Sequence, residues 1–277
     1  MKCLVIAAAL AAGLSAAMAP GANAAAVGAG GFENQLSGAV DTNIERVDGG
    51  DFRGVIGGGV GAANTFVGSN DIEGVLLPLF DIEWRGAYFL STQRGLGLNI
   101  IRKRTLRMGP RLTLDRGRDA GDDAFLTGMR DIDPTIEGGV FLVGFSGNWR
   151  IKADLRRGFS SGGHEGIVAS ADLAYAGRVD ERTSVVIGVN IHWANAAYAT
   201  RFFGVSTAEA TPIRPAFVGD AGFQDFGGYL TVVFNFSERV FISVQARAAN
   251  LVGSASDSPL SEDDLQVFTG TLLGFRF

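Results

Sequence analysis

The feature that most constrains this chain is an alternation of apolar and polar residues that begins near residue 52 and recurs to the C-terminus. Successive side chains of a β-strand point to opposite faces, so a period of two predicts strands with one apolar face. The segment 149–156 shows the pattern clearly, with alternating residues Trp149, Arg150, Ile151, Lys152, Ala153, Asp154, Leu155 and Arg156. Repeated segments of this kind, separated by polar or glycine-rich breaks, predict an all-β protein.

A soluble sandwich or lipocalin would also show one apolar face per strand. Three observations favour a transmembrane barrel. Several predicted strands have ten or more residues, enough to cross a bilayer obliquely, whereas strands of soluble proteins average about five or six. Tight turns alternate with long loops, as in outer-membrane barrels. The tryptophans all fall on the apolar face near strand ends, which predicts two interfacial aromatic girdles made by Trp84, Trp149 and Trp193.

The alternation of turns and loops also predicts the number of strands. Between a tight turn at 85–86 and a long loop that begins near 116, the chain must cross an odd number of times, and one crossing cannot hold about thirty residues. We therefore predict a transmembrane antiparallel up-and-down β-barrel of about twelve strands, with both termini in the periplasm. Ten strands follow instead if 87–102 forms an insertion on the loop side. The predicted strands are 52–63, 74–85, 87–92, 95–102, 105–115, 135–146, 149–158, 165–177, 183–194, 222–236, 239–252 and 266–277.

The N-terminal residues predict export. Lys2 precedes an apolar run, 4–17, and Ala22-Asn23-Ala24 fits a signal-peptidase site, so we interpret 1–24 as a cleaved signal peptide. A membrane anchor is disfavoured because the run is short and is followed by Pro20-Gly21. Residues 25–50 are polar and glycine-rich and are predicted to form a periplasmic lead-in, and 51–277 the barrel. The destination is then the outer membrane of a Gram-negative cell.

Cleavage also changes composition. It removes Cys3 and so excludes a disulfide, a thiolate metal site or a cysteine nucleophile from the mature chain. The net charge of −5 becomes −6 without Lys2, which argues against a nucleic-acid partner.

The sequence offers little material for catalysis. Its two histidines are His164 and His192. His164 lies near Ser160 and Ser161, and a Ser–His pair is admissible in a lipid hydrolase, but a solvated loop histidine is the favoured interpretation. His192 is expected to face the interior, where Asp172 on the adjacent strand could reach it. We predict no catalytic residues and a protein that is not an enzyme.

Metal and cofactor sites are not predicted either. Several aspartates crowd one loop and could recruit divalent cations that bridge lipopolysaccharide phosphates, although a solvated run of charge is favoured: Asp115, Asp119, Asp122, Asp123 and Asp131. The glycine-rich segment 57–61 lacks the following helix and lysine of a phosphate loop, so we interpret it as a closely packed strand.

The polar faces of the predicted strands should line the barrel interior. They carry mixed charges, which predict either an interior filled by ion pairs, the favoured interpretation, or a narrow pore with a slight preference for anions. The predicted interior residues are Asp81, Glu83, Arg85, Arg107, Arg111, Asp115, Arg150, Lys152, Asp154, Arg156, Asp172, Arg247 and Arg276.

Six motifs are spread over the chain: GGGVGAANTFVGSND at 57–71, LLPLFDIEWRGAYFLSTQRGLGLNI at 76–100, GMRDID at 128–133, GGHEG at 162–166, RFFGVS at 201–206 and DSP at 257–259. In their order and spacing, these motifs resemble those of the MipA/OmpV family of outer-membrane proteins. The sequence departs from the family at 63–66, Ala-Asn-Thr-Phe, where members often carry a Pro-Glu-Tyr-like stretch. The last strand ends in Phe275 and Phe277, which resembles the recognition signal of the outer-membrane assembly machinery.

This resemblance implies a binding or transport role. One branch of the family is described as a scaffold that holds a lytic transglycosylase and a penicillin-binding protein together for peptidoglycan (murein) synthesis, and another as porin-like or as a surface adhesin. The scaffold is the predicted function, and the pore and the adhesin stay open as alternatives. The implied partners are these enzymes, the assembly machinery, outer-membrane lipid and lipopolysaccharide.

Overall fold

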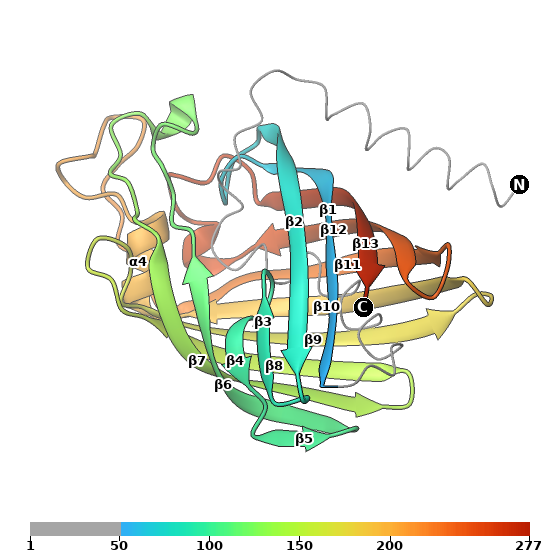
Figure 1. Cartoon of the computed structure of the whole chain (residues 1–277). Coiled ribbons are helices and arrows are strands. Elements are labelled where there is room, and N and C mark those ends of the chain that lie inside the picture. The colour runs from blue at the N-terminus through green and yellow to red at the C-terminus, as the bar shows by residue number, and fades with distance from the viewer. Residues whose placement is uncertain (1–50) are drawn as a thin grey trace, which may run out of the picture.

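The chain folds into an antiparallel β-barrel in which most strands pair with the strands that precede and follow them in the chain (Figure 1). The computed structural model describes residues 51–277, so the expected signal peptide and lead-in lie outside the described residues. The strands are β1 (Phe52–Asn64), β2 (Ile72–Trp84), β3 (Tyr88–Ser91), β4 (Gly95–Leu98), β5 (Ile101–Lys103), β6 (Leu106–Asp115), β7 (Thr135–Ser146), β8 (Trp149–Gly158), β9 (Ile167–Arg178), β10 (Thr183–Ala194), β11 (Gly222–Asn235), β12 (Val240–Leu251) and β13 (Leu265–Arg276).

These segments make twelve crossings, because β4 and β5 are two parts of one interrupted strand. Both pair with β6, through Leu96 opposite Leu112 and through Ile101 opposite Met108. Pairing of β1 with β13 and of β4 with β6 closes the ring. The prediction of a closed twelve-stranded barrel is confirmed, and the ten-stranded alternative is wrong, since 87–102 lies in the wall.

The strands of the barrel wall are short at the β3–β4 hairpin, where each has four residues. β2 pairs with β3 only from Asp81 to Trp84. Within residues 51–277, the edge of β2 before Phe80 therefore has no strand partner on that side.

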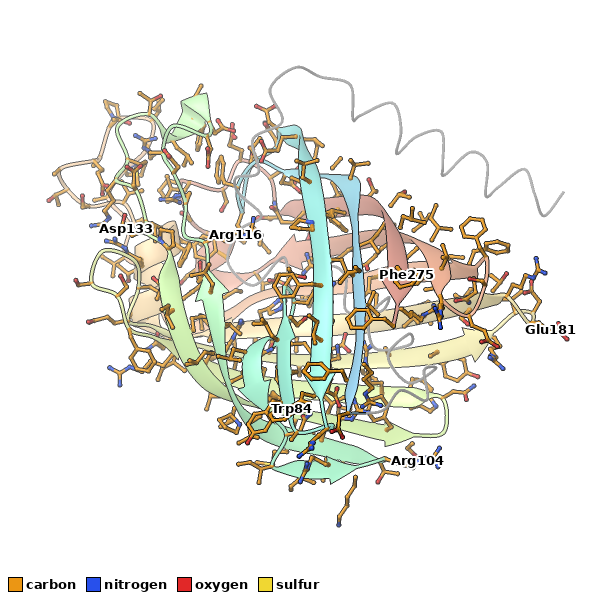
Figure 2. The ribbon with its side chains drawn as sticks, in the orientation of Figure 1. Trp84, Arg104, Arg116, Asp133, Glu181 and Phe275 are labelled. Atoms are coloured by element: carbon orange, nitrogen blue, oxygen red, sulfur yellow. The ribbon has the colours of Figure 1, made fainter. Side chains whose placement is uncertain are left out.

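The two ends of the barrel differ in their connections. Short turns follow β2, β5, β7, β9 and β11 at one end, which we call the turn end, and longer loops follow β1, β6, β8, β10 and β12 at the other, which we call the loop end. Figure 2 shows Trp84, Arg104 and Glu181 at the turn end and Arg116 and Asp133 at the loop end.

The loops are partly helical, which the strand pattern did not predict. They contain η2 (Ala124–Leu126), α4 (Ala196–Phe203) and η3 (Gly253–Ala255). The Oδ1 atom of Asn195 caps α4 by accepting a hydrogen bond from the backbone N–H of Tyr198 at 3.1 Å, and it also accepts one from Ile167 at 3.0 Å. Within residues 51–277, no helix is long and apolar enough to cross a membrane.

The outer face of the barrel is apolar. Outward side chains such as Leu76, Leu112, Ile151, Ile187 and Leu273 are about half exposed, while their strand neighbours are buried or half-buried. An exposed apolar band of this kind is typical of a barrel whose outer face contacts the hydrocarbon core of a membrane.

Candidate functional site

The barrel interior is the candidate site, and it divides into two sectors of opposite chemistry. The apolar sector comes from β1, β2, β11, β12 and β13 and consists of Val55, Ala63, Val75, Leu77, Leu79, Val233, Phe241, Phe268 and Leu272, all buried. The charged sector comes mainly from β6 to β9 and from the turn-end half of β2. Its inward arginines and carboxylates form ion pairs.

Ion pairs link the strands β6, β7 and β8 of the charged sector. The Arg111 guanidinium lies 2.6 Å from Asp154, and Arg156 lies 2.7 Å from the same carboxylate and 3.2 Å from Glu137. These side chains are at most 10% exposed. The contacts tie β6, β7 and β8 together on the inside.

A second network crosses the interior. Arg150 on β8 donates to Asp172 on β9 at 2.8 Å and to the Tyr229 hydroxyl on β11 at 2.7 Å. The same hydroxyl donates to the other oxygen of Asp172 at 2.8 Å. The ring of Tyr229 covers Gly188 on β10, where an added Cβ would lie 2.4 Å from the ring. Glycine at 188 is therefore what lets the ring lie flat across β10 and reach the ion pair.

A third network surrounds the β3–β4 hairpin. Arg94, from the hairpin turn, donates to Asp81 at 2.5 Å and 2.8 Å, and its guanidinium lies 4.3 Å from the centre of the Phe89 ring. Arg53 on β1 donates to Glu83 at 2.6 Å. The short hairpin thus places a cation beside two carboxylates of β2.

His192 corrects one expectation. Its Nδ1 lies 2.8 Å from Asp225, which also pairs with Arg247 at 3.2 Å, and not beside Asp172. The register explains the difference, because His192 lies directly opposite Asp225 on β11, whereas Asp172 lies opposite Asn190. Asp172 is taken by Arg150.

The thirteen predicted interior residues fall into two groups. The structure places twelve in buried or half-buried inward positions: Asp81, Glu83, Arg107, Arg111, Asp115, Arg150, Lys152, Asp154, Arg156, Asp172, Arg247 and Arg276. Arg85 does not join them. It follows the last residue of β2, has a φ of 53°, and points outward with its side chain 61% exposed to pair with Asp51. The turn ends the alternation one residue earlier than expected.

Sequence reasoning missed several members of these networks. Glu137, Asp225 and Tyr229 lie at inward positions of predicted strands and alternate with apolar residues, so the period of two contained the signal. Arg53 and Arg94 lie near a strand start and in a turn, where no periodicity identifies them.

The loop end holds a buried cluster of three titratable residues. Asp115 ends β6, Glu137 lies on β7, and His164 belongs to the loop after β8. The Nε2 atom of His164 lies 3.5 Å from Asp115 and 3.4 Å from Glu137. Burial opposes a charge on the imidazole, but the two nearby carboxylates prevail and raise the pKa of His164 to about 9.

This burial corrects the expectation that His164 is solvated. The residue is 2% exposed because α4 covers it, with the rings of Tyr198 and Phe202 meeting the imidazole edge to face at 5.0 Å and 5.8 Å. Its neighbours are carboxylates, while the Ser160 hydroxyl accepts from the backbone N–H of Gly163. The glycine-rich sequence around His164 suggested a flexible loop, because nothing in it indicates that α4 packs on this loop.

The remaining aspartates of the acidic loop mostly bind the backbone of that loop. Asp119 accepts from Gly121, Asp131 from Ala120, and Asp123 from Phe125 and from the Thr65 hydroxyl. Burial and nearby Asp119 raise the pKa of Asp122. The favoured interpretation as a wholly solvated run of charge is therefore wrong for Asp115 and Asp123.

The loops meet over the barrel mouth. One apolar cluster joins four different loops through Phe66, Leu126, Met129, Val205 and Leu260, and a second joins α4 to Ile132, Val168, Leu251 and Ala255. Arg118 reinforces the contact by donating to the Phe202 carbonyl at 2.7 Å, and burial lowers the pKa of this arginine to about 10. The residues of the first cluster come from the loops after β1, β6, β10 and β12, so these loops meet over the opening.

A cavity lies in the interior beside the β3–β4 hairpin. It encloses about 790 Å³, counting space open to solvent. Its charged lining is mainly basic and consists of Arg94, Arg107, Arg111, Lys152, Asp154 and Asp172.

The predicted aromatic and terminal residues lie on the outer face. Trp84 stacks between Phe52 and Tyr88 at the turn end, and Trp149 contacts Tyr175 at the same end. Trp193 lies half-buried at the loop end of β10, and Phe275 is exposed (Figure 2). Phe277 extends the ladder by exchanging two backbone hydrogen bonds with Gly54, at 3.0 Å and 3.1 Å.

Comparison with known proteins adds the family. The family described as MltA-interacting protein MipA matches residues 56–277, which is nearly all of the barrel. This chain belongs to the MipA family. It is an outer-membrane β-barrel of that family. No curated protein matches it.

Solved structures of outer-membrane barrels resemble the MipA-family chain at low identity. The NanC porin is 8% identical over 81% of this chain and 100% of its own, with a TM-score of 0.46. An outer-membrane channel from Pseudomonas putida F1 is 9% identical over 83% of this chain and 100% of its own, with a TM-score of 0.41.

Proposed function

We propose that this protein is a platform in the outer membrane that binds peptidoglycan-remodelling enzymes and has no catalytic activity of its own. The observation that carries the proposal is the match of residues 56–277 to a family described as MltA-interacting protein. That name points to a lytic transglycosylase as one partner. A penicillin-binding protein is the second partner that we propose.

The packing of the barrel supports a function on its surface. Ion pairs and apolar side chains project into the interior, and the loops meet across one end. A solute that crossed the barrel would have to separate buried ion pairs, at a cost of several kcal/mol for each charge left unpaired.

We place the partner surface at the turn end and assign this end to the periplasm, where peptidoglycan lies. The turns there are short, with two to four residues between strands. A stable interface buries about 800 Å² per partner, which such turns alone would struggle to supply. Residues 25–50 precede β1, which begins at the turn end, so this lead-in is the additional surface that we propose. Its charged residues are Glu33, Asp41, Glu45, Arg46 and Asp48.

Site-specific photocrosslinking in intact cells tests the platform. A photoreactive amino acid at Glu181 or Glu238 in the turns, or at Glu33 in the lead-in, should crosslink to a lytic transglycosylase or a penicillin-binding protein identified by mass spectrometry. Ile213, 91% exposed in a loop at the opposite end, is the matched control and should give no such product. Absence of either enzyme from every turn-end product contradicts the platform, and its presence only at Ile213 reverses the proposed orientation.

A narrow pore is the second candidate, and the basic cavity beside the β3–β4 hairpin is the observation that favours it. Its four basic and two acidic side chains would favour small anions. Conductance in planar bilayers separates the pore from the platform.

We also propose that Phe275 and Phe277 act as the assembly signal. Deletion of Phe277 removes the two hydrogen bonds with Gly54 and the terminal aromatic ring, and should slow insertion and lower the outer-membrane level in part. Unchanged abundance and unchanged heat-modifiable gel mobility would contradict this role.

A further inference from the structure

The cluster of Asp115, Glu137 and His164 has the donor chemistry of a metal site. One imidazole nitrogen and two carboxylate oxygens, one from each residue, all lie within 4.8 Å of one another. The three residues come from β6, β7 and the loop after β8, and all three are buried. Imidazole nitrogen and carboxylate oxygen are ligands that Zn²⁺ takes in proteins.

In each carboxylate, one oxygen accepts a hydrogen bond from a neighbouring group and the other oxygen faces His164. Asp115 accepts from the Gly117 backbone N–H through Oδ1 at 2.8 Å, which leaves Oδ2 facing His164. Glu137 accepts from the Thr113 hydroxyl through Oε2 at 2.9 Å and pairs with Arg156 through the same atom, which leaves Oε1 facing His164. Supporting contacts of this kind orient the ligands in metal sites.

The separations fit a shared ion better than direct hydrogen bonds. The Nε2 atom of His164 lies 3.5 Å and 3.4 Å from the two presented oxygens, whereas an N–H···O hydrogen bond usually spans about 2.7–3.2 Å. Zinc bonds to nitrogen and oxygen are about 2.0–2.2 Å long, so neighbouring ligands of a tetrahedral ion lie about 3.3–3.5 Å apart.

His164 itself is a second, independent indication. Its side chain is 1% exposed and aimed at both carboxylates, yet neither ring nitrogen has a hydrogen-bond partner of normal geometry. Buried polar groups in native structures are almost always satisfied, so this orphaned imidazole calls for a partner that the cluster does not supply. A divalent cation would give the Nε2 atom of the imidazole a partner and would offset the charges of two buried carboxylates.

We propose that Asp115, Glu137 and His164 bind one divalent transition-metal ion, for which Zn²⁺ has the fitting geometry. The ion would join β6, β7 and the loop at 159–166 beneath α4, and water would complete its coordination. It would fasten the loop end, away from the turn end where we place the partner enzymes.

Metal binding by the folded, full-length barrel tests the proposal. After treatment with a chelator, Zn²⁺ is titrated into the detergent-solubilised protein against a chromophoric competitor. We expect one equivalent of tightly bound zinc in the wild type. The variants Asp115→Asn and His164→Gln should each weaken binding at least tenfold, while His192→Gln, which alters the other buried histidine, should leave it unchanged.

Heat-modifiable mobility first establishes that each variant is folded, and Glu137→Gln, which keeps the shape of the side chain, is a further test if His164→Gln does not fold. Loading with Co²⁺ adds a readout of coordination, since a d–d absorption spectrum of low-coordinate cobalt should appear in the wild type and in His192→Gln only. Two results would overturn the proposal. Equal binding by wild type and His164→Gln would assign the zinc to other groups, and absence of binding to the wild type would show that the cluster is a protonated imidazole held between two carboxylates.

Discussion

The two sectors of the barrel interior are packed with side chains of different chemistry. In the charged sector, inward arginines and carboxylates of β6 to β9 meet in ion pairs, within one strand or between strands. In the apolar sector, inward aliphatic and phenylalanine side chains of β1, β2, β11, β12 and β13 pack together, and they are as well buried as the ions. The outer face is apolar around both, so the bilayer does not dictate the difference.

The comparison shows where the barrel is tolerant. An apolar contact is not directional, so loss of one side chain costs transfer energy and leaves a cavity. An ion pair depends on both members, and removal of one leaves the other charge unpaired in a poorly hydrated interior. The charged sector should therefore be the more fragile, and the predictions that follow rank single changes by this difference.

The largest effect is expected for Asp172→Ala in the charged sector. The change removes the carboxylate that binds both Arg150 and the Tyr229 hydroxyl and should lower the free energy of unfolding by about 3–5 kcal/mol. Urea unfolding of the refolded protein in vesicles measures it. The matched control is Arg85→Ala, which breaks the Asp51 pair where both side chains are more than half exposed, and should cost about 0–1 kcal/mol. Equal losses in the two variants would contradict the ranking.

The apolar sector should respond to Leu272→Ala with a loss of about 3 kcal/mol, because the side chain is 1% exposed and leaves a cavity. Leu273→Ala on the same strand is the control. Leu273 faces outward and is 54% exposed, so lipid can fill the space it vacates and the loss should be smaller. A larger loss for Leu273 than for Leu272 would show that lipid contact outweighs interior packing.

A smaller effect is expected where β1 packs against β13. A Cβ on Gly59 would lie 2.0 Å from the Thr271 carbonyl oxygen, so Gly59→Ala forces the two strands apart and should cost about 1–3 kcal/mol. Gly58→Ala is the control, because its Cβ would meet nothing closer than 3.7 Å. Urea unfolding in vesicles compares the two variants. Equal losses of unfolding free energy in Gly59→Ala and Gly58→Ala would contradict the steric explanation.

The sequence predicted the strands closely because a wall with lipid outside and packed side chains inside imposes a strict period of two. It predicted the twelve crossings because turn and loop lengths fix the direction of each strand. It did not reveal the apolar sector, since the run from Val75 to Phe80 is apolar on both faces and carries no alternation. Leu77 and Leu79 therefore lie inside without a signal in the pattern.

The candidate site was less predictable than the fold. Alternation indicates which residues face inward, but partners depend on register, as the pairing of His192 with Asp225 shows. The burial of His164 depends on α4, which is more than thirty residues further along the chain and packs on the 159–166 loop. Contacts of this kind are tertiary, and a local pattern cannot specify them.

Conductance in a planar bilayer tests most directly the central claim that the interior is filled and that the function lies on the surface. The account predicts no steady conductance steps for the purified, heat-modifiable protein, because ion pairs, apolar side chains and the joined loops obstruct the path. Steady steps whose selectivity shifts toward cations in a variant with Arg107→Glu and Lys152→Glu, two changes in the lining of the basic cavity, would contradict it and establish a pore.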